Sequence, residues 1–522
     1  MSLASTPHSP QTLSARSRWL VLVAAFLGWM FDGFEMGLFP LVAKPALADL
    51  LQTKDETVIV RWIAVITAVF LIGAATGGVL FGWLGDRIGR VKAMTLSVMT
   101  YAVFCALCGV ANEAWQVAVL RFIASLGMGG EWALGIALVM EVWPNQSRAW
   151  LAGWIGAAAN FGFLLIAIVG LWLSAIIGDL GEFLLNVGIS METKERLVRH
   201  SGWRILMLFG AMPALLTFLI RLFVPESHRW EEEKKSGATS HWETRDLIGV
   251  LIGAAAACGM IGLLATDVHW ALRVVGSLAA FVVIVGGYLY PVRRYLHRLT
   301  SATTGSREEA HRENRITLRR MFLGAALSGI PLISLWGTIQ QTPSWVSSLP
   351  NGNRPEVRSY VQMTVAIGAI IGCITATLAS ERFGRRNTYF VLCILSLASL
   401  WALFRLNVEY NSTLLIWAFV AGMIATGHAG WLALYLPELF RTRVRATGQG
   451  FSYNFGRVFA AIGVMQLPII MSQLNVSFGV ACPVIALTYL IGMVLIWFAP
   501  ETRGLPLPDD LPQMSPQREQ GS

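Results

Sequence analysis

The sequence predicts an all-α polytopic membrane protein, and the reasons are its composition and the placement of its charges. Of the 522 residues, 55% are hydrophobic and only 14% are charged, whereas soluble globular proteins carry about 25% charged residues. The charges fall in short clusters between apolar stretches of roughly 20 residues, each long enough to cross the hydrocarbon core of a bilayer. Because that core holds no water to satisfy backbone groups, each stretch must be a helix.

The first half of the chain contains six of these stretches. A polar segment, 1–18, precedes them and is predicted to be a tail. Two loops, 46–60 and 176–201, are predicted on the opposite side of the membrane, and Ser190 in the second loop is the expected N-cap of a short surface helix. The predicted N-terminal bundle, 19–224, has helices at 19–43, 62–84, 93–111, 115–140, 149–175 and 202–224.

The second half repeats this count after an inserted pair of helices. A polar linker, 225–246, leads to apolar stretches at 247–266 and 270–291, which are predicted to form a transmembrane hairpin over 247–291. A basic linker, 292–320, precedes a C-terminal bundle, 321–499, and a proline-rich tail, 500–522, ends the chain. The predicted helices of this bundle are 321–342, 358–380, 387–405, 413–437, 446–471 and 478–499. The fourteen predicted transmembrane helices therefore follow the order six, two, six.

The cations predict the orientation of the chain and exclude one class of partner. Lysine and arginine gather in alternate loops, on the side that holds both termini, so the positive-inside rule places both termini in the cytoplasm. We expect the inner membrane of a bacterium. The net charge of +9 forms no basic stripe or motif of the kind that binds nucleic acid. The expected partners are a lipid bilayer and a small-molecule substrate, with no nucleic acid, and the expected state is a monomer.

The six cysteines all lie in apolar stretches. Cys105 and Cys108 have the CxxC spacing of some redox and metal sites, but two small residues one turn apart on a membrane helix favour packing. We therefore expect no disulfide framework and no metal site. We also expect no cofactor, and the expected coupling ion is a proton. The first apolar stretch is too long for the core of a signal peptide and is predicted to be a retained helix.

A cationic turn motif occurs twice and indicates an internal duplication. Gly82–Lys92 reads GWLGDRIGRVK between two apolar stretches, and Ser380–Arg386 repeats an acid, a glycine and several arginines in the second half. A second repeated pattern is an acid followed by an arginine at the same separation in each half: Glu141 with Arg148, and Glu438 with Arg445. Two such halves suggest parallel repeats, as in the major facilitator fold.

Each turn motif is predicted to be a latch that forms in one access state and breaks in the other. A carboxylate at a helix end accepts backbone N–H groups and meets the positive helix terminus, and arginines bridge to acids on neighbouring helix ends. The second copy, with Glu381 for Asp86 and Thr377 for Gly82, is predicted to be the weaker latch. The predicted gating residues are Gly82, Asp86, Arg87, Gly89, Arg90, Glu141, Arg148, Glu381, Arg382, Arg385, Glu438 and Arg445.

These motifs resemble the major facilitator superfamily over nearly the whole chain. The resemblance rests on GxxxDRxGRxK after the second helix, on Arg121 with Gly127–Trp132, and on PES and PET at the ends of the halves. Phe31–Glu35, MGGEW and the extra hairpin are similar to bacterial sialic acid and related carboxylate:proton symporters, with metabolite:proton and aromatic-acid:proton symporters as close alternatives. Two departures are Thr377 in place of the leading glycine of the second motif, and Arg441 where sugar-porter relatives usually have proline. The resemblance implies a transporter with two six-helix bundles.

Ionisable residues inside membrane helices are functional candidates because a charge in hydrocarbon is costly. Asp32 and Glu35 share one face of the first helix, and Arg121 reaches a similar depth at 1.5 Å per residue. The sequence predicts an ion pair of Arg121 with one of these two acids. Two close carboxylates and burial raise the proton affinity of an acid, so we predict that the three residues couple transport to protons. The alternative is a purely structural ion pair.

The substrate site is predicted near the middle of the membrane, where pseudo-symmetric polar positions of the two halves meet. The spacing from Glu141 to Glu438 also relates Glu131 to His428, and Asn160 to Arg457. Arg457 is the expected partner of an anion because a guanidinium matches a carboxylate; alternatively it pairs with Glu131. His428 could titrate or serve as a packing residue. Amides and aromatic rings suit a polyol or sugar acid, which adds Trp336, Gln340, Gln341, Tyr453 and Asn454.

The predicted function is secondary active transport by alternating access, as proton symport of a small organic anion or a sugar acid such as sialic acid. The alternatives are symport of an aromatic acid, a dicarboxylate or a neutral sugar, and export of metabolites or drugs. Acids and amides in the core fit polar cargo better than a drug. No HExxH, serine–lysine or paired-aspartate motif is present, so we expect no enzyme activity.

Overall fold

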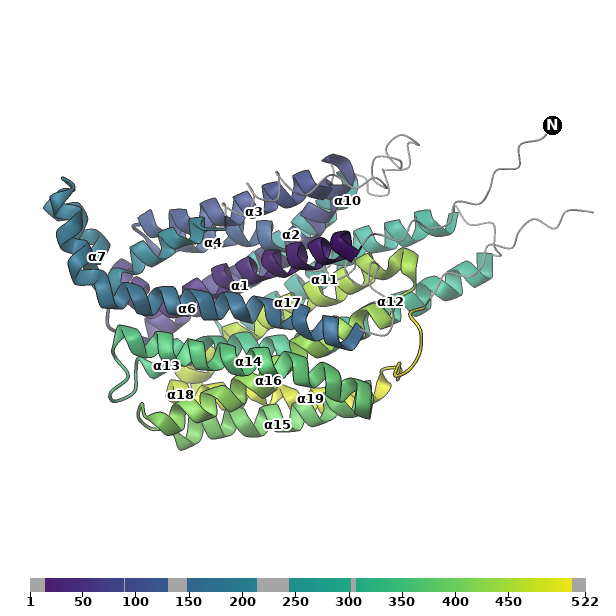
Figure 1. The fold of residues 1–522 in the computed structure, drawn as a ribbon. Coiled ribbons are helices and arrows are strands. Elements are labelled where there is room, and N and C mark those ends of the chain that lie inside the picture. The colour runs from purple at the N-terminus through teal and green to yellow at the C-terminus, as the bar shows by residue number, and fades with distance from the viewer. Residues whose placement is uncertain (1–14, 89, 130–147, 214–243, 302–306, 509–522) are drawn as a thin grey trace, which may run out of the picture.

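A computed structural model of the chain describes residues 15–88, 90–129, 148–213, 244–301 and 307–508. In these ranges the regular elements are all helices, and the long helices run side by side in one bundle (Figure 1). Twelve described helices are long and apolar enough to cross a membrane. The other two predicted spans, 115–140 and 202–224, continue into residues outside the described ranges. The predicted all-α membrane fold is confirmed.

In its described residues the first half contains six helices and two short 3₁₀ turns. These elements are α1 (Ala15–Leu51), α2 (Glu56–Ile88), α3 (Arg90–Leu107), η1 (Cys108–Val110), α4 (Ala114–Met128), α6 (Arg148–Asn186), α7 (Met191–Leu208) and η3 (Phe209–Ala211). The end of the bundle at which α1 begins also holds residues 500–508, and we call it the termini end (Figure 1).

The second half begins with the hairpin and continues with the C-terminal bundle. The hairpin is α10 (Thr244–Ala265) and α11 (Trp270–Ser301). The bundle contains α12 (Arg307–Gly337), η4 (Ile339–Gln341), α13 (Thr342–Val346), α14 (Pro355–Phe383), α15 (Arg385–Leu406), α16 (Ser412–Glu438), α17 (Thr442–Leu474), α18 (Phe478–Ala486), α19 (Thr488–Leu495) and η5 (Ile496–Phe498). The short helix α13 lies at the end opposite the termini, which we call the α13 end (Figure 1).

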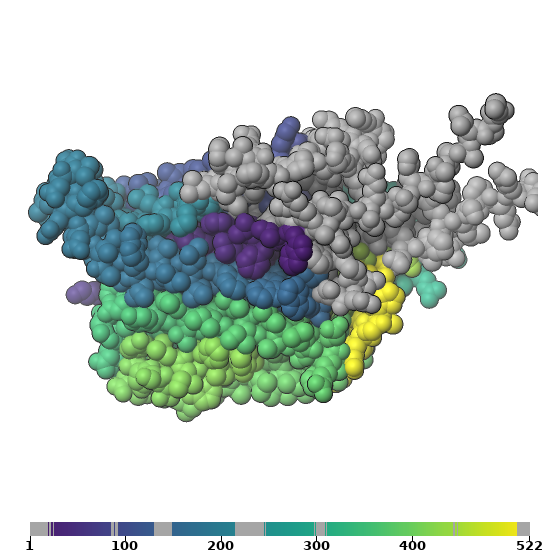
Figure 2. All heavy atoms as spheres, viewed as in Figure 1, coloured from purple at the N-terminus to yellow at the C-terminus, as the bar shows by residue number. Residues whose placement is uncertain are grey.

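The two halves meet along two seams. In the first seam α6 packs on α14 and α16, and in the second α2 packs on α17. Small residues bring the helix backbones close together; at Gly156, for example, a Cβ would collide with the backbone of Gly430. The two halves form two stacked layers on the face seen in Figure 2. The hairpin helix α10 contacts both α2 and α17, so the hairpin lies over the second seam.

Several segments predicted to be loops are helical. α1 continues into the predicted loop 46–60 as far as Leu51, because Ala46, Leu47 and Leu50 are buried against other helices, and α2 begins at Glu56. α6 and α7 likewise occupy most of the predicted loop 176–201. Ser190 caps α7 as predicted, since its side chain accepts a hydrogen bond from the backbone N–H of Thr193.

The predicted linker 292–320 is also largely helical, because α11 extends to Ser301 and α12 begins at Arg307. Arginine and glutamate favour helices, so a membrane helix continues into water where its side chains become charged. The linker 225–246 lies almost wholly outside the described residues. The first residues of the predicted tail 500–522 pack on the bundle, where the Tyr435 hydroxyl donates to the Pro500 carbonyl at 2.7 Å.

Candidate functional site

A break in one helix shapes the central cavity. The helix predicted at 321–342 ends at Gly337 and resumes as η4 and α13. The broken turn satisfies its own carbonyl groups, since Thr338 Oγ1 donates to Ser334 at 2.6 Å and Gln341 Nε2 donates to Trp336 at 3.0 Å. Irregular backbone at this depth is stable where it lines a cavity. The break turns Trp336 and Gln340 toward that cavity.

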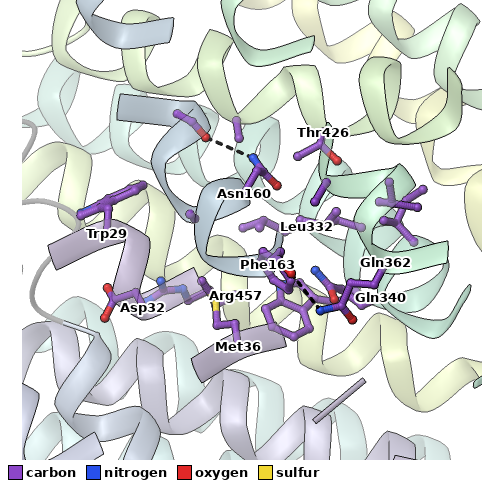
Figure 3. A pocket seen from close by; sticks show the side chains of 18 of the residues that line it. Trp29, Asp32, Met36, Asn160, Phe163, Leu332, Gln340, Gln362, Thr426 and Arg457 are labelled. Carbon is purple, nitrogen blue, oxygen red and sulfur yellow. Dashed lines mark hydrogen bonds between the residues drawn. The ribbon is translucent and has the colours of Figure 1, made fainter. Parts of the chain in front are cut away.

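The cavity lies between the two halves and has a volume of about 90 Å³, several times the ~10–15 Å³ that one water needs on the same measure. Its walls come from α1 and α6 of the first half and from α12, η4, α13, α14, α16 and α17 of the second (Figure 3). The polar and aromatic side chains that line it are Trp29, Asp32, Asn160, Phe163, Trp336, Gln340, Gln362, Thr426, Tyr453 and Arg457. Leu332, Leu335, Ile339, Val365 and Met36 add an apolar surface.

Arg457 brings a buried positive charge to this cavity. Its Nη1 donates to Asn454 Oδ1 at 3.0 Å and to the Ala74 carbonyl at 3.5 Å, and its Cζ lies 4.9 Å from the centre of the Tyr453 ring. These partners are neutral, and no carboxylate of the described residues lies within the 4.0 Å of an ion pair. Asp32 lines the same cavity and interacts with Arg457 electrostatically. The site therefore presents a guanidinium and a carboxylate to one small volume.

Three uncharged polar side chains complete the lining. Asn160 Nδ2 donates to the Gly156 carbonyl at 3.4 Å (Figure 3). Gln362 Nε2 donates to the carbonyls of Gly37 and Phe163, at 3.2 and 3.3 Å, which joins α14 to α1 and α6. Gln362 Oε1 and Thr426 Oγ1 are buried without a hydrogen-bond partner among the described residues. Such atoms usually bind water or a ligand.

The second acid of α1 faces a different partner. Glu35 forms a buried ion pair with Arg121, so of the two acids predicted to pair with this arginine the structure selects Glu35. The Arg121 guanidinium lies over the rings of Phe39 and Phe70, at 5.3 and 4.4 Å from their centres. A cavity of about 10 Å³ beside the pair is lined by Arg121 and by Gln341. Trp336 and Gln340 line both cavities and thus separate them.

Three predicted substrate residues lie outside the main cavity. His428 is fully buried in the C-terminal bundle, where its ring stacks on Tyr489 at 5.3 Å and its Nδ1 contacts the Ala425 carbonyl at 3.1 Å. His428 does not line the main cavity in this geometry, because its ring packs on Tyr389 and Tyr489 of its own half; its contact with substrate stays a prediction. Asn454 holds Arg457 without lining the cavity, and Gln341 lines only the small cavity. Glu131 lies outside the described residues.

The second copy of the turn motif is a dense network at the termini end. Arg385 donates from Nε and Nη2 to both oxygens of Glu438, at 3.0 and 2.8 Å, and Thr502 Oγ1 donates to the same carboxylate at 2.6 Å. Gly384 forms the turn with φ +93°, which favours glycine. All these residues belong to one bundle, so the contacts join helix ends within the C-terminal half. Glu381 and Arg382 stay exposed, and Arg445 Nη2 donates to the Pro508 carbonyl at 3.1 Å.

Glu501 extends this network from the predicted tail. It accepts the backbone N–H groups of Arg385 at 2.9 Å and of Arg386 at 3.1 Å, and those of Thr502 and Arg503. Burial raises the pKa of this carboxyl, but the four backbone donors outweigh burial and leave the pKa below its ordinary value.

In the first copy of the motif, Gly82, Asp86 and Arg87 end α2, Arg90 begins α3 and Arg148 begins α6. Gly89 and Glu141 lie outside the described residues. The backbone thus places the predicted turn between α2 and α3.

Sequence reasoning missed Trp29, Met36, Phe163, Gln362 and Thr426 as lining residues. Gln362 offered a signal, because it is an amide near the start of a long apolar stretch. Because an amide is uncharged, it lacks the cost of a charge in hydrocarbon that identified the ionisable candidates. The apolar and hydroxyl residues carried no signal that distinguishes them from packing residues.

The chain is similar in sequence and in fold to known membrane transporters. The Sugar (and other) transporter family matches residues 20–246 and 351–509. A probable 4-methylmuconolactone transporter of Cupriavidus pinatubonensis is 25% identical over 92% of this chain and 90% of its own length. The sialic acid transporter NanX of Escherichia coli is 22% identical over 91% of this chain and 92% of its length. The solved structure of the proton:xylose symporter XylE superposes with a TM-score of 0.63 and 16% identity, covering 95% of this chain and 98% of that one.

Proposed function

Because the chain belongs to the Sugar (and other) transporter family of the major facilitator superfamily, and is therefore a membrane transporter of small metabolites and not an enzyme, we propose that its cargo is a small organic anion. The observation that supports this most is the lining of the central cavity. There Arg457 has only neutral hydrogen-bond partners among the described residues. Asp32 interacts with Arg457 from beyond ion-pair distance, so a carboxylate of the cargo would supply the direct partner, with two charge-assisted hydrogen bonds.

The lining also favours a particular kind of anion. Phe163, Leu332 and Val365 present apolar surface, whereas the uncharged polar groups are few. A compact acid with an unsaturated or ring-shaped body fits this mixture, which we rank above a sugar acid rich in hydroxyl groups. The relatives named for 4-methylmuconolactone and for sialic acid represent these two cargo types. Export of metabolites is a further alternative.

We further propose that transport is coupled to protons through Asp32. This carboxylate shares the cavity with Arg457 and interacts with it. When the cargo occupies Arg457, Asp32 loses part of its electrostatic support, and a proton becomes the natural replacement. Glu35 is neutralised by Arg121 beside the cavity, so we assign this pair to stabilising α1 against α4 and Asp32 to the coupling step.

The test is uptake by proteoliposomes that contain the full chain. The probes are benzoate, 4-methylmuconolactone and N-acetylneuraminate, with xylose as the neutral compound. We expect at least one anion to accumulate when the outside is more acidic than the inside, with no accumulation of xylose. Uptake that ignores the pH gradient would refute proton coupling, and uptake of xylose alone would refute the anion assignment.

We infer from the charge distribution that both termini face the cytoplasm of a bacterial cell and that the chain lies in its inner membrane. A single cysteine introduced near position 515 should resist a membrane-impermeant maleimide in intact cells and react after lysis. Labelling in intact cells would reverse the orientation.

A further inference from the structure

Arg358, in the first turns of α14, is a buried cation that the proposed transport site has not used. It is 7% exposed. Among the described residues Arg358 makes no hydrogen bond or ion pair; Glu356, two residues earlier, interacts with it electrostatically from beyond ion-pair distance and lies 3.8 Å from the more exposed Arg354. A buried charge of this kind is unfavourable unless something pairs with it.

Other buried arginines of the described chain are treated differently. Arg121 pairs with Glu35, Arg204 pairs with Asp49 at 3.2 Å, and Arg385 pairs with Glu438 at 2.8 Å. Arg358 resembles Arg457 instead, because neither has a carboxylate within ion-pair distance in the described residues. The similarity suggests that the same ligand neutralises both.

The helix geometry places Arg358 on the route between the cavity and the α13 end. Arg358, Gln362 and Val365 stand at positions i, i+4 and i+7 and therefore share one face of α14. Gln362 and Val365 line the cavity, and Arg358 lies about 6 Å further along the axis. α13 packs on α14 and on α1, and its Pro343 also lines the cavity, so α13 bounds the cavity at this end. Arg358 lies one turn nearer the start of α14 than Gln362 does.

We propose that Arg358 is a second anion subsite, which binds the carboxylate of the cargo as it passes between the α13 end and the Arg457 cavity. This assignment rests on the proposed function. The guanidinium fork matches a carboxylate. A lipid phosphate would offer similar chemistry, but the burial of Arg358 inside the bundle favours the cargo.

The experiment compares Arg358→Gln with Arg354→Gln, which removes a largely exposed arginine one turn away, and with Arg457→Gln. The probe is the anion of the uptake panel that the wild type transports fastest. We expect Arg358→Gln to raise the KM of uptake at least tenfold, Arg354→Gln to change it less than twofold, and Arg358→Lys to recover part of the loss. Unfolding temperatures in detergent verify that each variant folds.

The outcomes separate the subsite from the transport site. If Arg457→Gln loses uptake but Arg358→Gln behaves like Arg354→Gln, the subsite is refuted and the transport site stands. If Arg457→Gln leaves uptake intact, or if the wild type takes up no anion, the proposed function fails with it. Probe affinity measured in lipid-free dodecyl maltoside decides between partners: an Arg358→Gln defect that is present only with phospholipid assigns Arg358 to lipid and refutes the cargo subsite.

The hairpin supports a second, independent inference. The Tyr288 hydroxyl of α11 lies 2.8 Å from Thr76 Oγ1 of α2, and its ring packs edge-on to Phe455 of α17 at 6.2 Å. One side chain of the hairpin thus contacts both halves across the α2–α17 seam. The contact lies close to Arg457, which follows Phe455 by two residues and donates to Ala74, two residues before Thr76.

We infer that Tyr288 is a positioning residue that holds α2 against α17 behind Arg457. Tyr288→Phe removes only the hydroxyl, and Thr76→Val removes its partner. We expect each to raise the KM for the same anion at least threefold. Thr76→Val also removes the bond that Thr76 Oγ1 donates to the Ile72 carbonyl at 2.8 Å, so the double variant should show no loss beyond that of Thr76→Val alone, because the Tyr288–Thr76 bond is already absent there.

The matched control is Tyr290→Phe, since Tyr290 is 42% exposed and contacts Arg294 at 3.2 Å. An unchanged KM in Tyr288→Phe, an effect equal to that of Tyr290→Phe, or additive effects in the double variant would each refute the inference. Saturating uptake rates measured alongside distinguish a loss of affinity from a general loss of active protein.

Discussion

Arg121 and Arg457 are both buried arginines near the centre of the bundle, one in each half, and their surroundings differ in one respect. Arg121 is neutralised by Glu35 and enclosed by the rings of Phe39 and Phe70. Arg457 has amide, carbonyl and aromatic partners and opens onto the main cavity. A protein that pairs a carboxylate directly with a cation fixes that cation in place, whereas one that supplies only neutral hydrogen-bond partners and holds its acid, here Asp32, beyond ion-pair distance leaves room for the charge of a ligand.

The largest expected effect is on stability and comes from breaking the ion pair of Glu35 with Arg121. Glu35→Gln leaves the Arg121 charge buried without its carboxylate, and the free energy of unfolding should fall by about 3–5 kcal/mol. Denaturant unfolding in detergent micelles measures this loss. The double replacement Glu35→Leu with Arg121→Met removes both charges and should recover most of it. An equal loss in the single and double variants would show that packing, and not charge, holds this pair.

The next effect is on anion affinity and comes from replacing Arg457, which lines the main cavity. Arg457→Lys keeps the charge but removes the planar fork, so we expect the affinity for the transported anion to fall roughly 10- to 100-fold, which corresponds to about 1.5–3 kcal/mol. The unfolding free energy should change little because lysine keeps the positive charge that interacts with Asp32. Isothermal calorimetry gives the affinity. An unchanged affinity would assign Arg457 to structure and erase the contrast with Arg121.

The two acids of α1 sharpen the comparison further. Asp32→Asn should reduce proton-driven accumulation about tenfold or more while anion exchange across the membrane continues, because exchange needs no net proton movement. Uptake and counterflow in proteoliposomes measure the two activities. Accumulation that survives in Asp32→Asn would transfer the coupling step to another acid, and Glu35→Gln is the variant to examine next.

A smaller effect concerns the carboxylates at the termini end. The folded-state pKa of Glu501 is depressed, so the stability that it contributes is present above its unfolded pKa and is lost as pH falls through the lower folded value. The contribution is about 1 kcal/mol or less because the side chain is largely exposed. A spin label at Leu505 should become mobile in acid, as the pH falls through the depressed pKa of folded Glu501, whereas in Glu501→Gln the mobility should not depend on pH. Equal pH dependence in both proteins would contradict this account.

The smallest expected effect is at His428, which is buried away from the cavity. His428→Gln should change the affinity for the anion and the pH dependence of uptake less than twofold. The uptake assay used for Asp32→Asn provides the measurement. A large shift of the pH profile would restore the sequence-based role of this histidine.

The amount that could be predicted differed between the fold and the site. The membrane class, the helices and the two six-helix halves followed from apolar length and from the repeated turn motif, because hydrocarbon imposes one length and one secondary structure. Helix ends were less predictable: α1, α6, α11 and α12 all continue beyond the membrane-length stretch. Outside the hydrocarbon, tertiary contacts such as the burial of Leu47 decide whether the chain remains helical.

The sequence by itself determined which residues could matter, since an acid, an arginine or an amide inside an apolar stretch is visible without any structure. Only the tertiary structure decided how they are used. Asp32 and Glu35 are equivalent by depth and spacing, and the rotation of α1 against α4 gives Glu35 to Arg121 and Asp32 to the cavity. Helical periodicity fixes the angles between side chains on one helix, but the direction in which that helix faces is set by packing against its neighbours.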